Sequence, residues 1–400
     1  MHPHILASII TLLLIACIVA IVAEWFKITY TIALVLVGLI VAYLHITPEV
    51  FISHDVIFTL ILPPLLFHGA MHMDLEQLKK NWKPISMLAV LGVVLSTLLI
   101  GFLLNQFWRI EFIYALLFGA LITPTDPVSV LSILKKIGAP QRLRVILEGE
   151  SVFNDGTGVV VFSIILGIIS GAKSFHLGDT LLTFLKVTGG GTLIGGVVGF
   201  LAYKLLKKIN DHLLEVAITV VLTFGTPLLA EHFHFSGIIA VVVAGLIIGN
   251  YGRVYSMSEK TRDTLETFWE VIEFIINSLL FLIVGLELQV IRSQSITFPW
   301  LYIVYGILAV LVSRLFVVYP IVWIKNKISS RDLPWSWSHV LFWGGLKGSI
   351  SIALVVGLPP EFKYREFFLT AAFSVVLFTL VVQGLSMRTV IRSLKLNKNA

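Results

Sequence analysis

Long apolar runs dominate the sequence and decide what it can fold into. A continuous apolar run of about 20 residues spans the hydrocarbon core of a bilayer as a helix, whereas membrane-spanning strands alternate. With 57% apolar and only 13% charged residues, a soluble domain could not cover its apolar surface. The sequence therefore predicts an all-α polytopic membrane protein with about 13 transmembrane helices. The thirteen runs are 5–23, 28–45, 51–70, 84–106, 112–135, 149–170, 178–203, 212–230, 236–251, 268–290, 299–324, 337–357 and 366–387.

Positive charge is distributed unevenly over the short loops between these runs. An odd number of spans places the two termini on opposite sides. If the N-terminus is outside, 21 Lys and Arg residues fall in the inner loops and tail, and 5 fall in the outer loops. Because Lys and Arg concentrate in cytoplasmic loops, we expect an external N-terminus and a cytoplasmic C-terminus. The same excess explains the net charge of +6 without a nucleic-acid partner.

Two prolines interrupt the fifth run. Pro124 and Pro127 bracket Thr125 and Asp126, and each proline removes a backbone donor and clashes with the preceding turn. Broken backbone at membrane depth is tolerated only where protein buries it or where it lines a wet cavity. Freed carbonyls, a hydroxyl and a carboxylate would form an oxygen-rich cation site. The alternative is a simple proline kink capped by Asp126.

A second polar cluster opens the sixth run. Ser151 and Asp155 are four residues apart and share one helix face, and Asn154 borders that face. Asp155 lies too far inside the run to cap its helix. An ionisable residue within a membrane span is a functional candidate, because it is costly to insert.

The twelfth run carries a third cluster. Gly344, Gly345 and Gly348 weaken the helix in mid-span, and Lys347 places a cation there, which glycines for packing alone would not explain. The twelfth run lies seven runs after the fifth, and an odd offset inverts its orientation. Two interrupted helices in oppositely oriented halves indicate an inverted-repeat transporter with its site at the midplane.

Small residues recur in the seventh run. Gly191, Gly195 and Gly199 are spaced four apart. This spacing predicts a helix that packs closely against a neighbour.

Five motifs occur together and in order along the chain. They are LPPLLF (62–67), TDPVSVL (125–131), GESVFNDGTG (149–158), NSLLFLIVGL (277–286) and GGLKGSISIAL (344–354). With these motifs the chain resembles, over essentially residues 5–390, the monovalent cation/proton antiporters. The likeness is to the Na⁺/H⁺ exchanger branch that includes prokaryotic NhaP-type proteins. It implies two crossed, unwound helices in the fifth and twelfth runs.

The resemblance also implies a division of the single membrane domain (1–400). Residues 5–83 and 178–290 would form a dimerisation part, and residues 84–170 and 299–388 a mobile ion-carrying core. Residues 389–400 would form a short cytoplasmic tail. The protein would be a homodimer in a prokaryotic inner (plasma) membrane.

The resemblance further assigns roles to the polar residues. Asp155 would carry the proton and the cation in turn. The ion- or proton-binding positions would be Asp155, Asp126, Ser151, Thr125, Asn154 and His68, with Na⁺ at Asp155, Asp126, Ser151 and Thr125. The charges that stabilise the core would be Glu150, Lys347 and Arg314, with Glu150 and Lys347 as a pair. An Asn before the Asp, as at Asn154, marks the electroneutral branch.

Two positions depart from the family pattern. His68 stands where an acidic residue is usual, and Lys347 stands where Arg is usual. Lys is a point charge and cannot form a bidentate clamp on a carboxylate. We expect both departures to affect the ligand set and the pH range.

We therefore predict a secondary antiporter that exchanges Na⁺, or Li⁺ or K⁺, for H⁺ by alternating access. Burial disfavours the charged form of a carboxylate and a bound cation favours it, so proton and cation would compete for Asp155. We expect no enzymatic activity and no cofactor. A cation channel is one alternative, but nothing in the sequence repeats like a filter. An intramembrane enzyme, with Asp126 and Asp155 as an aspartyl pair, is another.

Overall fold

The computed structural model describes residues 3–26, 30–44, 54–171, 177–293, 300–328, 333–394 and 396. All regular elements within these residues are helices, and each of the thirteen predicted segments coincides with a helix or with a chain of short helices. Several positive residues counted for orientation lie outside the described residues. They are Lys27, Lys173, Arg331, Lys395 and Lys398.

Six predicted segments form single long helices. They are α1 (Pro3–Phe26), α10 (Gln141–Ile169), α11 (Leu177–Leu206), α12 (His212–His232), α15 (Glu259–Ser293) and α16 (Trp300–Ile328). The second segment is the shorter α2 (Tyr30–Tyr43), and α5 (Leu75–Lys80) is a short helix in a connection. The side chain of Asp74 caps α5 by accepting hydrogen bonds from the backbone of Glu76 and Gln77.

Four segments continue through a π-helical stretch. The third segment is α3 (His54–Val56), η1 (Ile57–Ile61) and α4 (Leu62–Met71), and the fourth is α6 (Trp82–Ser86), η2 (Met87–Leu91) and α7 (Gly92–Trp108). The ninth is α13 (Gly237–Ile247), η3 (Ile248–Gly252) and α14 (Arg253–Tyr255), and the thirteenth is α19 (Arg365–Phe378), η4 (Thr379–Gly384) and α20 (Leu385–Ser393).

The fifth and twelfth segments are broken, as predicted. Helices α8 (Phe112–Ile122) and α9 (Val128–Lys136) are separated by non-helical residues 123–127, and α17 (Trp335–Trp343) and α18 (Ser349–Val356) by residues 344–348. The prolines and glycines of the two motifs lie in these gaps. The hypothesis of two interrupted helices is confirmed.

Seven helical stretches of the described chain are long and apolar enough to cross a membrane, judged by length and composition. They are Trp82–Trp108, Gln141–Ile169, Gly178–Leu206, His212–His232, Gly237–Tyr255, Ile303–Ile328 and Arg365–Ser393. Shorter apolar helices are Ile10–Trp25, Ile57–Met71 and Phe112–Ile122. The separate halves of the two broken segments are thus too short to cross a membrane on their own.

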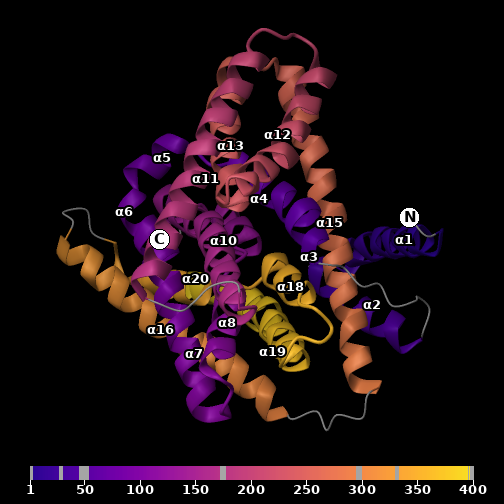
Figure 1. Ribbon diagram of the computed structural model, residues 1–400, viewed down its shortest axis with the longest axis vertical. Helices are drawn as coiled ribbons and strands as arrows, with labels where there is room; N and C mark the ends of the chain where they lie inside the picture. The colour runs from indigo at the N-terminus through magenta and orange to yellow at the C-terminus, as the bar shows by residue number, and fades with distance from the viewer. Residues whose placement is uncertain are drawn as a thin grey trace.

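The helices form two groups around α10 (Figure 1). Helices α11, α12 and α13 pack against one another, and α13 also packs on α4. Helices α7, α8, α16 and α19 form the other group, while α10 contacts both α8 and α13. The motif-bearing α10 therefore lies at the centre of the bundle.

Helix α11 packs on α13 through its glycines. A Cβ at Gly195 would overlap the carbonyl of Ala240, and a Cβ at Gly191 would lie 2.5 Å from the carbonyl oxygen of Ser236. The close packing predicted from the glycine spacing is confirmed. The opposite face of α11 exposes large apolar side chains, among them Leu182, Leu193 and Leu201. A helix that is apolar on both its packed and its exposed faces suits a lipid environment.

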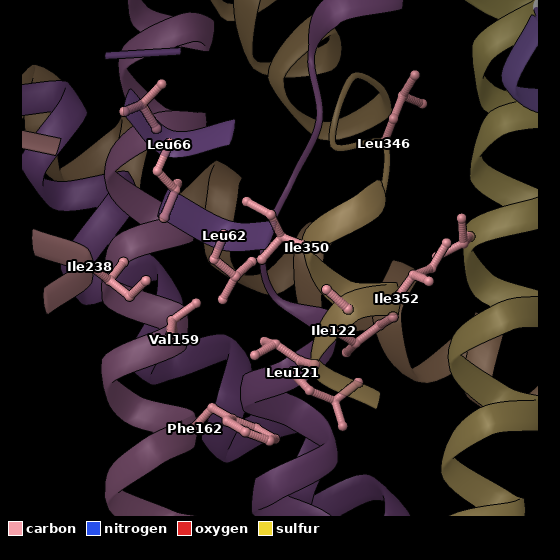
Figure 2. Packing of buried hydrophobic residues seen from close by; sticks show 14 of the residues in the cluster. Leu62, Leu66, Leu121, Ile122, Val159, Phe162, Ile238, Leu346, Ile350 and Ile352 are labelled. Carbon is pink, nitrogen blue, oxygen red and sulfur yellow. The ribbon is translucent and has the colours of Figure 1, made fainter. Parts of the chain in front are cut away.

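One large apolar cluster surrounds the broken helices. It joins Leu121 and Ile122 of α8, Val159 and Phe162 of α10, and Ile350 and Ile352 of α18 (Figure 2). Leu346, in the gap before α18, belongs to the same cluster and is fully buried. The non-helical backbone is thus enclosed by protein, as broken backbone within a membrane must be.

Candidate functional site

The central site is built where the gap after α8 meets α10. Within the gap, Thr125 is buried and Asp126 is half-buried. Ser151, Asn154 and Asp155 lie on successive turns of α10 and are all buried. The structure therefore brings together the first two predicted polar clusters.

Helix α10 satisfies the polar groups that the break sets free. The hydroxyl of Ser151 donates to the Thr125 carbonyl at 2.6 Å. The Asn154 side chain donates from Nδ2 to Thr125 Oγ1 at 2.8 Å and accepts from the Thr125 backbone N–H at 3.3 Å. Buried backbone groups need such partners because leaving them unpaired is costly. Asn154 is thus held in place as a neutral donor and acceptor.

Asp155 keeps unused bonding capacity. Its side chain is 7% exposed, and Oδ1 is buried with no hydrogen-bond partner among the described residues. A buried carboxylate oxygen without a partner is costly. A proton or a bound cation would each satisfy it.

Asp126 joins the two broken helices. Its backbone N–H donates to the carbonyl of Leu346 at 2.8 Å, and its Oδ1 accepts from the N–H of Val128 at 3.0 Å at the start of α9. Gly348 lies so close that a Cβ there would be 2.8 Å from Asp126 Oδ2. The crossing predicted for the fifth and twelfth segments is therefore confirmed.

A cavity of about 490 Å³ opens onto these residues. Asp155, Thr125 and Ser151 line it, and the lining continues to Lys135 at the end of α9 and Glu266 near the start of α15. Those helix ends belong to the side predicted as cytoplasmic. The acidic residues that line the cavity are Asp126, Glu148, Asp155, Glu266, Glu270 and Glu273. Among the described residues, the lining thus carries six carboxyl groups against the one lysine, Lys135. An excess of one sign of charge in a cleft concentrates the opposite ion, so this cavity favours cations.

The core charges pair differently from the expectation. Glu150, which is 1% exposed, forms an ion pair with Arg314, and Arg314 Nη2 also donates to the carbonyl of Leu341 at 2.8 Å. Lys347 instead donates from Nζ to the carbonyl of Thr123 at 2.8 Å, and its backbone N–H donates to Thr379 Oγ1 at 3.0 Å. Arg314 is therefore the ion-pair partner of Glu150, the role that the family resemblance implied for Lys347. Lys347 stabilises the broken backbone before α9.

His68 lines the same cavity as the central site. It is on α4, 8% exposed, and its Nδ1 lies 2.5 Å from Oε2 of Glu273 on α15. Glu273 was not among the residues predicted for the site. The sequence feature that could have indicated Glu273 is its spacing: Glu266, Glu270 and Glu273 recur at intervals of four and three residues, which places them on one face of a helix.

No group of three or more His, Cys, Asp or Glu side chains in the described chain gathers as a metal cluster. The oxygen atoms around Asp155 come instead from a hydroxyl, an amide and a backbone carbonyl. Oxygen atoms of this kind suit hard cations, whereas imidazole and thiolate ligands suit transition metals.

A helical bundle with two crossed, broken helices and a buried carboxylate facing a cation-attracting cavity defines an ion-transporting membrane protein. The chain belongs to the transmembrane sodium/hydrogen exchanger family, whose model matches residues 11–393.

Curated relatives agree with this family, and a solved structure shares the fold. The chain is 41% identical over 370 residues to the Na⁺/H⁺ antiporter ApNhaP of Aphanothece halophytica, covering 92% of this chain and 70% of that one. It is 43% identical over 350 residues to NhaP of Pseudomonas aeruginosa (84% and 81%), and 40% identical over 403 residues to NhaH of Halobacillus aidingensis (97% and 98%). Its fold matches the sodium proton antiporter MjNhaP1 of Methanocaldococcus jannaschii with a TM-score of 0.81, 20% identity and 98% coverage of both chains.

Proposed function

We propose that this chain is a secondary active antiporter that exchanges Na⁺ for H⁺ across the membrane. The observation that carries the proposal is Asp155, a buried carboxylate with an unpartnered oxygen that lines a cavity rich in acidic residues. The family of the chain and the names of its relatives as Na⁺/H⁺ antiporters support the same activity.

Asp155 alternates between two ligands in this mechanism. A proton neutralises the carboxylate directly, and a Na⁺ ion neutralises it by binding. Each state satisfies the buried oxygen, whereas the empty, charged state is costly in a low-dielectric site. Proton and cation therefore exclude each other, and only the loaded states move. Because Asn154 cannot ionise, one H⁺ exchanges for one Na⁺ and the cycle is electroneutral.

The Na⁺ site comprises oxygen atoms around Asp155. Its proposed ligands are Asp155, Asp126, Ser151 and Thr125, all of which line the cavity. Hydroxyl and carbonyl oxygens replace part of the water shell of the ion, as hard cations require. Ser151 and Thr125 already contact each other through a hydrogen bond of 2.6 Å, so both oxygens belong to one local site.

Alternating access follows from movement of two parts. The cavity lies between α4 and α15, which belong to the proposed dimerisation part (5–83 and 178–290), and α9, α10 and α18, which belong to the proposed core (84–170 and 299–388). Movement of the core against the other part carries Asp155 from one side of the membrane to the other. We place the N-terminus outside, the C-terminus in the cytoplasm and the homodimer in the inner (plasma) membrane.

The test uses purified protein in liposomes with an acidic interior and a pH-sensitive dye. External Na⁺, Li⁺ or K⁺ should alkalinise the interior of wild-type liposomes with saturable kinetics, and the ranking of the ions names the substrate. Asp155→Asn should abolish the response.

Asp263→Asn serves as the matched control, because Asp263 is exposed on α15 and does not line the cavity. It should transport like wild type. No response from well-folded wild-type protein to any of the three cations would overturn the proposed function.

A further inference from the structure

Helix α15 presents a polar face to the cavity that the exchange mechanism does not yet use. Glu266, Glu270, Glu273 and Asn277 line the cavity and are spaced by four, three and four residues. This spacing keeps them on one side of a helix. They follow one another along α15 from its proposed cytoplasmic end into the membrane, along the cavity that also contains the central site.

The inner two members of this face form a connected pair. Asn277 donates from Nδ2 to Glu273 Oε1 at 3.3 Å, and Oε2 of Glu273 lies 2.5 Å from His68 Nδ1. The Oδ1 atom of Asn277 is buried and has no hydrogen-bond partner among the described residues, and Asn277 is 8% exposed. A buried amide oxygen without a partner has lost its hydrogen bonds to water without replacing them, which costs free energy.

The outer two members are situated differently. Glu266 is an ion-pair partner of Arg253, and its Oε1 lies 3.5 Å from Nε2 of His72. Glu270 is exposed, so water competes there with any protein ligand for a cation. The only place on this face that combines a partly buried carboxylate with an unpartnered amide oxygen is therefore the Glu273–Asn277 pair.

We propose that Glu273 and Asn277 form a second binding site for the transported monovalent cation, separate from the site at Asp155. Carboxylate and amide oxygens are the ligand types that hard cations take in proteins. The site lies in the wall of the same cavity as Asp126 and Asp155. A cation held there has given up part of its water shell before it reaches Asp155. The inference rests on the proposed function, since it concerns the same cation.

The decisive experiment measures equilibrium binding of ²²Na⁺ to the purified full-length protein, with competition by Li⁺ and K⁺. In Asp155→Asn the exchange site is disabled, but saturable binding should persist. Adding Glu273→Gln should remove that binding, whereas adding Asp263→Asn, on the same helix but outside the cavity, should leave it intact. Adding the conservative Glu273→Asp should also preserve it, which separates charge from folding.

Two results would overturn the second site. One is complete loss of saturable cation binding in Asp155→Asn alone. The other is persistence of that binding in the Asp155→Asn/Glu273→Gln double variant. Monodisperse elution of each variant establishes that it is folded.

A kinetic measurement adds an independent readout. In liposomes, Glu273→Gln alone should raise the KM for the cation by about tenfold while kcat stays within about twofold, because a loading site contributes binding and not the exchange step. A purely structural defect would lower kcat as well and would contradict the proposal. If wild type exchanges no cation, the antiport function itself fails, whichever way the binding experiment turns out.

Discussion

The backbone N–H of Asp126 donates to the carbonyl oxygen of Leu346 at 2.8 Å, and this bond joins the backbones of the two helix breaks. The donor and the acceptor are both groups that a broken helix leaves without their usual partners. Within a membrane such groups must find partners inside the protein. The contact therefore fixes the position of Asp126, and with it one wall of the ion site.

The close approach of Gly348 to Asp126 leads to a first prediction. A Cβ at position 348 would overlap Asp126 Cβ and lie 2.8 Å from Oδ2. Gly348→Ala should displace Asp126, cost about 1–3 kcal/mol of stability as an overpacked site does, and reduce cation-dependent exchange strongly. Gly225→Ala on α12, where an added Cβ meets no atom within 4 Å, is the control and should keep wild-type exchange. Equal activity of the two variants would contradict the role of the close contact.

The buried Glu150–Arg314 pair leads to a second prediction, on stability. Glu150→Gln leaves the Arg314 guanidinium buried without its counter-charge and should cost about 3–5 kcal/mol. Lys363 and Glu111 form a comparable pair with side chains 51% and 54% exposed, and Glu111→Gln should cost at most about 1 kcal/mol. Thermal unfolding of the purified variants, followed by loss of monodisperse protein, compares the two. A similar small shift for both would show that burial does not strengthen the inner pair.

The third prediction concerns charge movement. Asn154 is neutral and hydrogen-bonded to Thr125, and the proposed mechanism has Asp155 as the one carboxylate that exchanges a proton for the cation in each cycle. The exchange rate at a fixed pH gradient should therefore not change when an ionophore sets the membrane potential. A net charge moved per cycle would couple to the potential by about 2.3 kcal/mol per 100 mV. A clear acceleration by an inside-negative or an inside-positive potential would refute electroneutral exchange.

The fourth prediction concerns His68. An imidazole can carry positive charge beside Glu273, but a carboxylate at position 68 cannot, and it would instead add a negative charge to the cavity wall. His68→Glu should therefore displace the pH profile of exchange, measured between about pH 5 and 9, because histidine side chains in general change charge between about pH 5 and 8 and glutamate does not. His339 contacts Tyr319, and neither residue lines the cavity, so His339→Gln should leave the profile unchanged. Coincident profiles of wild type and His68→Glu would remove His68 from the ion-handling residues.

Much of the fold follows from local sequence. The lengths of the apolar runs gave the helical segments, and Pro124, Pro127 and the glycines around Lys347 gave the positions of the two breaks. These features act within a few residues of where they occur, because proline and glycine alter their own backbone and the adjacent turn. The grouping of Ser151, Asn154 and Asp155 on one helix face is equally local.

Contacts between distant segments could not be read in the same way. The family resemblance implied a pair of Glu150 and Lys347, whereas in the structure Glu150 pairs with Arg314 and Lys347 donates to the carbonyl of Thr123. All four residues belong to different predicted membrane segments. Which basic side chain contacts a given carboxylate depends on the angles at which the helices cross and on the lengths of the side chains. No periodicity in the sequence carries that information.

By itself, the sequence determined the membrane class, the helical segments, the two broken spans and the central carboxylate at Asp155. A helix that spans lipid must be long and apolar, and a break in such a helix requires particular residues. Each of these features is therefore determined by a short stretch of sequence. Only the tertiary structure decided that the breaks meet at Asp126 and Leu346 and that α15 directs Glu273 and Asn277 into the cavity. Those relationships arise when helices far apart in the chain pack together, because packing selects which polar groups share one enclosed space.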